Sequence, residues 1–111
     1  MTINEVAANL GLKPISKVED REVNGVFVSD MLSDVMAGAE SGNLWVTVQT
    51  HKNIIPAANL VDISALIITN GKKVPDDTIE LANKHHIAVF TTSMKTFELV
   101  GKLYGLGLAT K

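Results

Sequence analysis

Hydrophobic residues recur along the chain in short runs that predict buried strands, and most of these runs end in small polar residues. Residues 44–49 alternate, which places Leu44 and Val46 on one face of a strand and Trp45 on the other. The run at 65–69 is apolar up to its last residue, as in a central parallel strand covered on both faces. The pattern predicts four core strands, at residues 26–28, 44–49, 65–69 and 87–91.

Segments whose apolar residues recur at helical spacing lie before, between and after these strands. Thr2 and Glu5 form a T-x-x-E capping box before a predicted helix at 3–10, which Gly11 ends. Ser29 or Asp30 is expected to cap a second helix, with Met31, Leu32, Val35, Met36 and Ala39 on one stripe.

Three more helices follow along the chain. One, at 54–60, is expected to be capped from the loop 50–53 and tolerates Pro56 in its first turn. Another starts at Pro75 and ends near His85 and His86. Thr92 or Ser93 is expected to cap the last helix, with an inner stripe of Met94, Phe97, Val100, Leu103 and Tyr104.

Strands that alternate with helices imply crossover connections. The predicted fold class is therefore α/β, a three-layer architecture with a largely parallel central sheet and helices on both faces. A short strand at 12–16 is expected at an edge, because Pro14 cannot donate to a ladder. No repeat or linker interrupts the chain, so we expect a single domain over residues 1–111.

Composition narrows the functional classes. The chain has no cysteine, a formal net charge of −2 and no run of basic residues, which argues against thiolate chemistry and against binding nucleic acid. The N-terminus does not resemble a signal peptide, and no apolar run is long enough to span a membrane. We therefore expect a cytoplasmic protein with no cofactor, no nucleic-acid partner and no membrane partner.

Polar side chains cluster where the predicted parallel strands end. Open α/β sheets bind ligands at the carboxyl ends of their strands, so these side chains are the candidate ligand-binding residues. Each also has a structural explanation as a helix cap, a turn or a loop closure. The candidates are Ser29, Asp30, Gln49, Thr50, His51, Asn53, Thr69, Asn70, Thr91 and Thr92.

An enzyme is the weakest interpretation, and no catalytic residue is assigned. His51 would serve as a general acid or base only if a partner such as Asp30 oriented it. No close cysteine or third histidine joins His85 and His86 in a metal site, so these are expected to be structural or solvated. Trp45, Met31 and Met36 are expected to pack in the core or in a dimer interface.

Two blocks of the sequence carry a family resemblance. VFVSDMLSDVMAGAESGNLWVTVQTHKNIIPAANLVDISALIITNG and IAVFTTSMKTFELVGKLYGLG resemble the DRTGG domain, over about Thr2 to Gly107. That domain occurs alone, beside CBS domains in a subclass of inorganic pyrophosphatases, and in phosphate acetyltransferases. It is also similar to the N-terminal domain of HPr kinase/phosphorylase.

The resemblance implies an α/β fold, a tendency to form homodimers and a regulatory or binding role, without catalytic residues to transfer. Kinase chemistry is not implied, because the chain has no G-x-x-x-x-G-K-[ST] phosphate loop. One departure concerns the turn expected to be glycine-rich, which reads Thr69-Asn70-Gly71-Lys72-Lys73 and has a single glycine.

Three functions follow from the sequence. The first is a regulatory or ligand-binding module that senses a phosphorylated or nucleotide-like metabolite or contacts a partner protein. The second is a purely structural dimerisation or protein-interaction domain, and the third is an enzyme acting on phosphate esters.

Overall fold

The computed structural model describes residues 1–109 and contains five helices and five strands over that range. The helices are short, and no helix in the described range is long and apolar enough to cross a membrane. In chain order the elements are α1 Ile3–Leu10, β1 Lys13–Pro14, β2 Gly25–Val28, α2 Leu32–Gly38, β3 Asn43–Thr47, α3 Ile54–Val61, β4 Ala65–Ile68, α4 Asp76–Lys84, β5 Val89–Thr91 and α5 Thr96–Gly105.

The strands form one sheet in the order β1-β5-β4-β3-β2. Strands β2 to β5 are parallel, and β1 pairs antiparallel with β5 at the edge, as Pro14 predicted. The predicted strand limits differ from the observed ones by at most two residues. The α/β class and the largely parallel sheet are confirmed.

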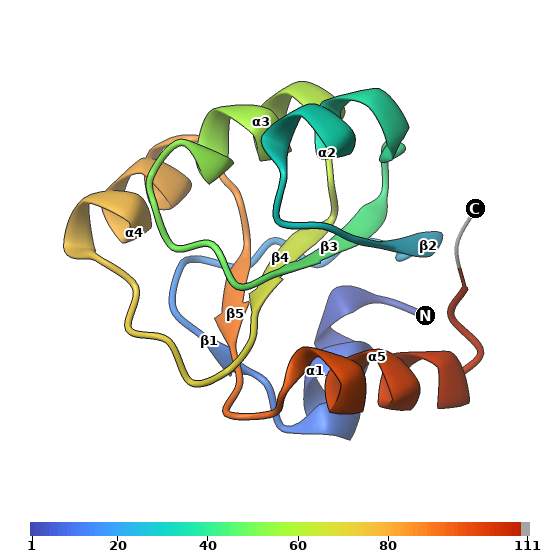
Figure 1. Cartoon of the computed structure of the whole chain (residues 1–111). Helices are drawn as coiled ribbons and strands as arrows, with labels where there is room; N and C mark the ends of the chain where they lie inside the picture. Colours follow the sequence, from blue (N-terminus) through green and yellow to red (C-terminus); the bar gives the residue numbers. More distant parts are fainter. Residues whose placement is uncertain (110–111) are drawn as a thin grey trace.

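Helices cover both faces of the sheet (Figure 1). Helices α2, α3 and α4 lie on one face, and α1 and α5 lie on the other. Strand β4 supplies both core clusters, because Ala65 and Ile67 pack toward α1 and α5 while Leu66 and Ile68 pack toward α2, α3 and α4. Trp45 is fully buried, as expected for a core residue.

Helix α1 has the predicted ends. The Thr2 hydroxyl accepts a hydrogen bond from the Glu5 amide, and the Glu5 carboxylate accepts one from the Thr2 amide. Gly11 then ends the helix in the left-handed conformation, at a φ of 64°.

The predicted cap of α2 is wrong, and only part of its predicted apolar stripe is buried in the single chain. Its N-cap residue is Met31, which makes no side-chain capping bond, and neither Ser29 nor Asp30 occupies that position. Met31 is 59% exposed and Met36 is also exposed, so neither belongs to the core of the single chain. The part of the predicted stripe that packs inward is Val35 with Leu32 and Ala39.

The start and the inner face of α5 also differ from prediction. The helix begins at Thr96 with Lys95 as its N-cap residue, so Thr92 and Ser93 are not caps. Of the predicted inner stripe, Leu103 is buried and Met94 and Val100 pack against the core, whereas Phe97 is 91% exposed and Tyr104 is 74% exposed. Leu99, which was not predicted, is fully buried beside Leu103, because this side of the helix packs against the sheet.

The predicted end of α4 is correct. The helix ends at Lys84 with His85 as its C-cap residue, and His86 has a positive φ of 58°. Nδ1 of His86 lies 3.5 Å from the Glu19 carboxylate, and both side chains are exposed. This geometry agrees with the expectation that the two histidines are structural or solvated.

A polar contact joins the connection before β2 to the end of α3. Arg21 donates from Nη1 and Nη2 to the two carboxylate oxygens of Asp62, at 3.0 and 3.2 Å, and the Ser41 hydroxyl donates to Asp62 Oδ2 at 2.5 Å. The hydrogen bond from Ser41, followed by those from Arg21, lowers the pKa of Asp62 below its ordinary value of 3.8. The carboxylate form is therefore the one that stabilises the fold.

We predict that Asp62→Asn removes this stabilisation without straining the backbone, because Asn tolerates the left-handed conformation that Asp62 adopts at a φ of 63°. The expected loss at neutral pH is about 0.5–1 kcal/mol, since both partners are partly exposed. Because the folded pKa of Asp62 is lowered, the stabilisation is present above pH 3.8 and disappears as the pH falls through the folded value.

Urea unfolding at a series of pH values measures this difference. The stabilities of wild type and variant should converge in acid. Arg21→Gln serves as the complementary variant, and the double variant should lose less than the sum of the two single losses. A gap between wild type and Asp62→Asn that is unchanged in acid would contradict the assignment.

Candidate functional site

The parallel strands bring their carboxyl ends to one edge of the sheet, as predicted. Each core strand is followed at that edge by predicted site residues, with Ser29 after β2, Gln49 after β3, Thr69 after β4 and Thr92 after β5. We call the ten predicted residues together the strand-end edge. The geometry of each part of this edge shows which side chains close the fold and which remain exposed.

Asp30 and Gln49 come together between the ends of β2 and β3. The Asp30 carboxylate accepts hydrogen bonds from the Thr47 hydroxyl at 2.8 Å and from the Val48 amide at 2.9 Å. Gln49 Nε2 donates to the Asp30 carbonyl at 3.1 Å. These bonds close the loops that follow the two strands, so the structural explanation accounts for both side chains.

Ser29 also makes local contacts. Its hydroxyl oxygen accepts from the Met31 amide at 3.1 Å, which is a turn contact before α2. Its carbonyl accepts from Trp45 Nε1 at 2.8 Å, which satisfies the polar atom of a fully buried indole. The single tryptophan of the chain therefore touches the strand-end edge directly.

The residues that follow β4 and β5 are tied to each other. The hydroxyl groups of Thr69 and Thr96 lie 2.7 Å apart, which joins the end of β4 to the start of α5. The Thr92 hydroxyl accepts from the Met94 amide at 3.2 Å, a turn contact that replaces the predicted cap. Thr91 belongs to β5, between Ile68 of β4 and Lys13 of β1, and does not extend beyond the strand.

Asn70 has the least satisfied side chain of the strand-end edge. Asn70 and Gly71 both have positive φ values, 69° and 62°, and their amides donate to the carbonyls of Met94 and Thr92. Asn70 Oδ1 is buried and finds no hydrogen-bond partner among the residues that the structure describes. A single glycine is enough for this turn, because Asn also tolerates the left-handed conformation.

The loop 50–53 links the strand-end edge to the helices on one face. The Thr50 carbonyl accepts a hydrogen bond from Thr78 Oγ1 of α4 at 2.8 Å. His51 Nδ1 accepts from the Asn53 amide at 3.1 Å, just before α3. Asn53 is the N-cap residue as predicted, but its side chain makes no capping bond, and the His51 ring supplies the local acceptor instead.

His51 and Asp30 do not form an acid–base pair. The ring nitrogen Nδ1 of His51 is engaged with the Asn53 amide, and the Asp30 carboxylate is engaged with Thr47 and Val48. The orientation that general acid–base catalysis requires of such a pair is therefore not present here. Within residues 1–109, no three acidic or histidine side chains are grouped so that they could hold a metal ion.

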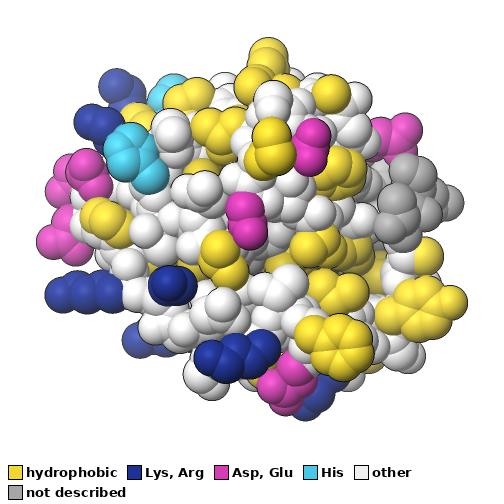
Figure 2. All heavy atoms as spheres, viewed as in Figure 1, with side chains coloured by type: hydrophobic (Ala, Val, Ile, Leu, Met, Phe, Trp, Pro, Cys, Tyr) yellow, Lys and Arg dark blue, Asp and Glu magenta, His cyan; other side chains and the backbone are white. Residues whose placement is uncertain are grey.

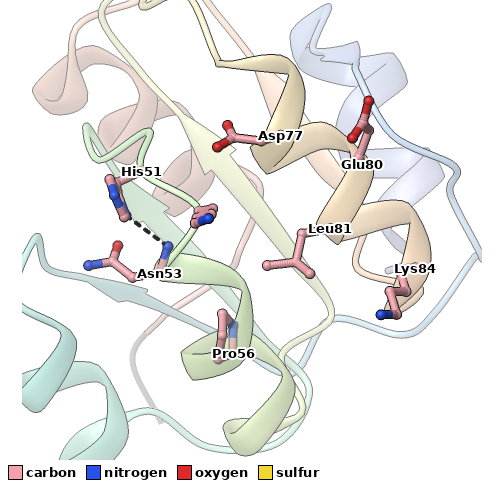
Figure 3. Close-up of a pocket in the computed structure, with 8 residues that line it drawn as sticks. His51, Asn53, Pro56, Asp77, Glu80, Leu81 and Lys84 are labelled. Atoms are coloured by element: carbon pink, nitrogen blue, oxygen red, sulfur yellow. Dashed lines mark hydrogen bonds between the residues drawn. The ribbon is translucent and has the colours of Figure 1, made fainter.

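A groove of about 450 Å³ runs between α3 and α4 (Figure 3). Its volume lies in the range of small-molecule sites. Of the residues that line it, only His51 and Asn53 are among the ten predicted site residues. We call this the α3–α4 groove, and its lining residues are His51, Lys52, Asn53, Pro56, Asp77, Glu80, Leu81 and Lys84.

The groove combines an apolar floor with a balanced set of charges. Leu81 points from α4 toward α3, where Pro56 lies on the opposite wall (Figure 3). Lys52 and Lys84 offset the charges of Asp77 and Glu80. The residues at 77, 80, 81 and 84 share one helical face, but this spacing alone does not tell which neighbour that face meets.

Comparisons with known proteins place these features in a family. The family model of the DRTGG domain matches residues 5–106. A solved structure, that of the CBS and DRTGG domains of the regulatory region of Clostridium perfringens pyrophosphatase complexed with the activator diadenosine tetraphosphate, has a TM-score of 0.68 and 20% sequence identity. The match covers 89% of this chain and 44% of that one, so this chain spans less than half of that structure.

No curated protein matches the chain. At 20% identity the solved structure establishes a shared fold. The family model is more specific, because it spans nearly the whole sequence, including the strands, the turn at Asn70 and the final helix. The chain therefore belongs to the DRTGG domain family.

Proposed function

We propose that this chain is a small regulatory module that binds a phosphorylated or nucleotide-like metabolite where the strand-end edge meets the α3–α4 groove. The observation that carries the proposal is the groove itself, a hollow of about 450 Å³ that opens beside the loop 50–53. Open α/β sheets bind ligands at this edge. The related pyrophosphatase region is a regulatory one, solved with a dinucleotide activator, which supports the ligand class.

The chemistry of the edge is suited to binding rather than to catalysis. Hydroxyl, amide and imidazole groups donate and accept hydrogen bonds, and Lys52 adds a positive charge next to His51. Most of these groups are held by contacts within the chain, so the edge offers a preformed surface. A preformed surface lowers the entropic cost of binding a small molecule.

A second function, homodimerisation, is favoured by a separate observation. Hydrophobic side chains gather where β2 and α5 lie at the surface (Figure 2). A shallow apolar hollow of about 70 Å³ lies in this region. We call it the β2–α5 surface, lined by Val26, Val28, Val100, Leu103, Tyr104, Leu108 and Ala109.

Strand β2 is the outer strand of the sheet on this side, and Val28 on it is 46% exposed. Exposed apolar side chains beside an edge strand favour association with a second copy, and a two-fold symmetric contact would bury the same patch on both chains. Homodimerisation and ligand binding use different surfaces, so the two proposed functions are compatible.

Ligand binding predicts a thermal shift with selected metabolites. A ligand present at 100 times its Kd stabilises the folded state by about 2.7 kcal/mol, which raises the melting temperature by about 10 °C in a domain of this size. The panel should include nucleoside mono-, di- and triphosphates, diadenosine tetraphosphate and sugar phosphates. Trp45 fluorescence gives a second signal, because its indole bonds the Ser29 carbonyl.

Gln49→Ala should weaken binding about tenfold, because it removes the hydrogen bond from Nε2 to the Asp30 carbonyl that holds the loop after β3 in place. Asn59→Ala, which removes an exposed amide from α3, is the matched control and should bind as wild type. The absence of any shift across the panel, together with a stable dimer, would leave only the structural function.

Homodimerisation predicts a mass of twice the chain in light scattering after gel filtration. The double variant Val28→Lys with Tyr104→Lys should be monomeric, because charges beside an edge strand oppose pairing. Leu60→Lys is the matched control, since Leu60 is a 73% exposed leucine on α3, away from this surface. A monomeric wild type, or a double variant that remains dimeric, would contradict the β2–α5 interface.

A further inference from the structure

We propose that the α3–α4 groove binds the purine base of the nucleotide-like ligand, so that the ligand is recognised mainly by its base. This inference rests on the proposed function and makes it specific. It depends on three properties of the groove: apolar side chains that face each other from α3 and α4, a donor and an acceptor at one end, and charges that cancel.

The floor suits a planar ring. Leu81 is half-buried on α4 and points toward α3, where Pro56 forms the facing wall (Figure 3). Proteins that read a single base commonly hold it between apolar or aromatic side chains and bond its polar edge. A volume of about 450 Å³ leaves room for a base and its sugar.

One end of the groove presents a hydrogen-bond donor and a hydrogen-bond acceptor, which together complement the polar edge of a purine. His51 Nδ1 accepts a hydrogen bond from the Asn53 amide, so the neutral ring carries its proton on Nε2 and can donate there. Asp77 projects its carboxylate from α4 toward the segment that carries His51 (Figure 3). A carboxylate accepts from the N–H groups of a purine, and an imidazole N–H donates to a purine ring nitrogen or carbonyl oxygen.

The charges argue for the base rather than the phosphates as the group in the groove. Lys52 and Lys84 are balanced by Asp77 and Glu80, so the groove offers no net positive field to a polyphosphate. The phosphates would then extend from the groove toward the strand-end edge. We therefore expect a nucleoside to bind within about tenfold of its nucleotide.

The walls of the groove are held in place before any ligand arrives. The hydrogen bond from Thr78 to the Thr50 carbonyl joins α4 to the loop 50–53, and Thr78 is fully buried. The bond from the Asn53 amide to His51 fixes the ring that would donate to the base. Preorganised donors of this kind give affinity because little conformational freedom is lost on binding.

Titration calorimetry of the full chain with adenosine, guanosine, their monophosphates and ribose 5-phosphate tests the inference. The purine nucleosides should bind and ribose 5-phosphate should not. His51→Asn should weaken nucleoside binding about tenfold, because the Asn oxygen can replace Nδ1 as acceptor for the Asn53 amide while the donor on the far side of the ring is lost. Asp77→Asn should also weaken binding.

Two leucine variants complete the design. Leu81→Gln should weaken nucleoside binding at least tenfold, whereas Leu60→Gln, at an exposed leucine that does not line the groove, should leave it unchanged. His51 and Asp77 are exposed, so their variants test the site even where Leu81→Gln fails to fold.

The outcomes separate this inference from the proposed function. The base-binding groove is overturned if nucleotide binding is unchanged in all three variants, His51→Asn, Asp77→Asn and Leu81→Gln. Strong binding of ribose 5-phosphate also overturns it. In both cases the proposed ligand-binding module is retained. Absence of binding by every member of both panels rejects the proposed function and, with it, the groove.

Discussion

Burial of β4 on both faces is the constraint on which the rest of the structure depends. Its four residues, Ala65 to Ile68, are completely buried and alternate between the two core clusters. A strand covered on both faces requires helices above and below it, and therefore crossovers between parallel neighbours. Those crossovers bring the polar ends of β2, β3, β4 and β5 to one edge. The location of the candidate site is thus a consequence of core packing.

Local signals in the sequence predicted the elements well, while their rotation and capping depended on distant contacts. The Thr2–Glu5 capping box and the apolar run of β4 act within a few residues, so both were readable from the sequence. The inner face of α5 was not, because two apolar stripes satisfy the same period and only the sheet distinguishes Leu99 from Phe97. For the same reason, the sequence left open whether Met31 and Met36 pack in the core or in a dimer interface, and both lie at the surface of the single chain.

The site shows the same division between local and long-range information. The position of the strand-end edge followed from the order of strands and helices, since parallel strands share their carboxyl ends. The α3–α4 groove did not follow, because it exists only where two helices from separate crossovers pack side by side. Leu81 and Asp77 belong to a helix far from His51 in the sequence, and no spacing rule connects them.

The structural and the ligand-binding explanations of the polar edge reinforce each other. Asp30, Gln49 and Thr69 are occupied by contacts that close the fold, which leaves them poorly placed to bind anything directly. Thr50, by contrast, holds its loop to α4 through Thr78, and this bond sets the wall from which His51 faces the groove. Satisfied hydrogen bonds at the edge therefore serve binding indirectly, because they keep the exposed donors and acceptors of the groove in fixed positions.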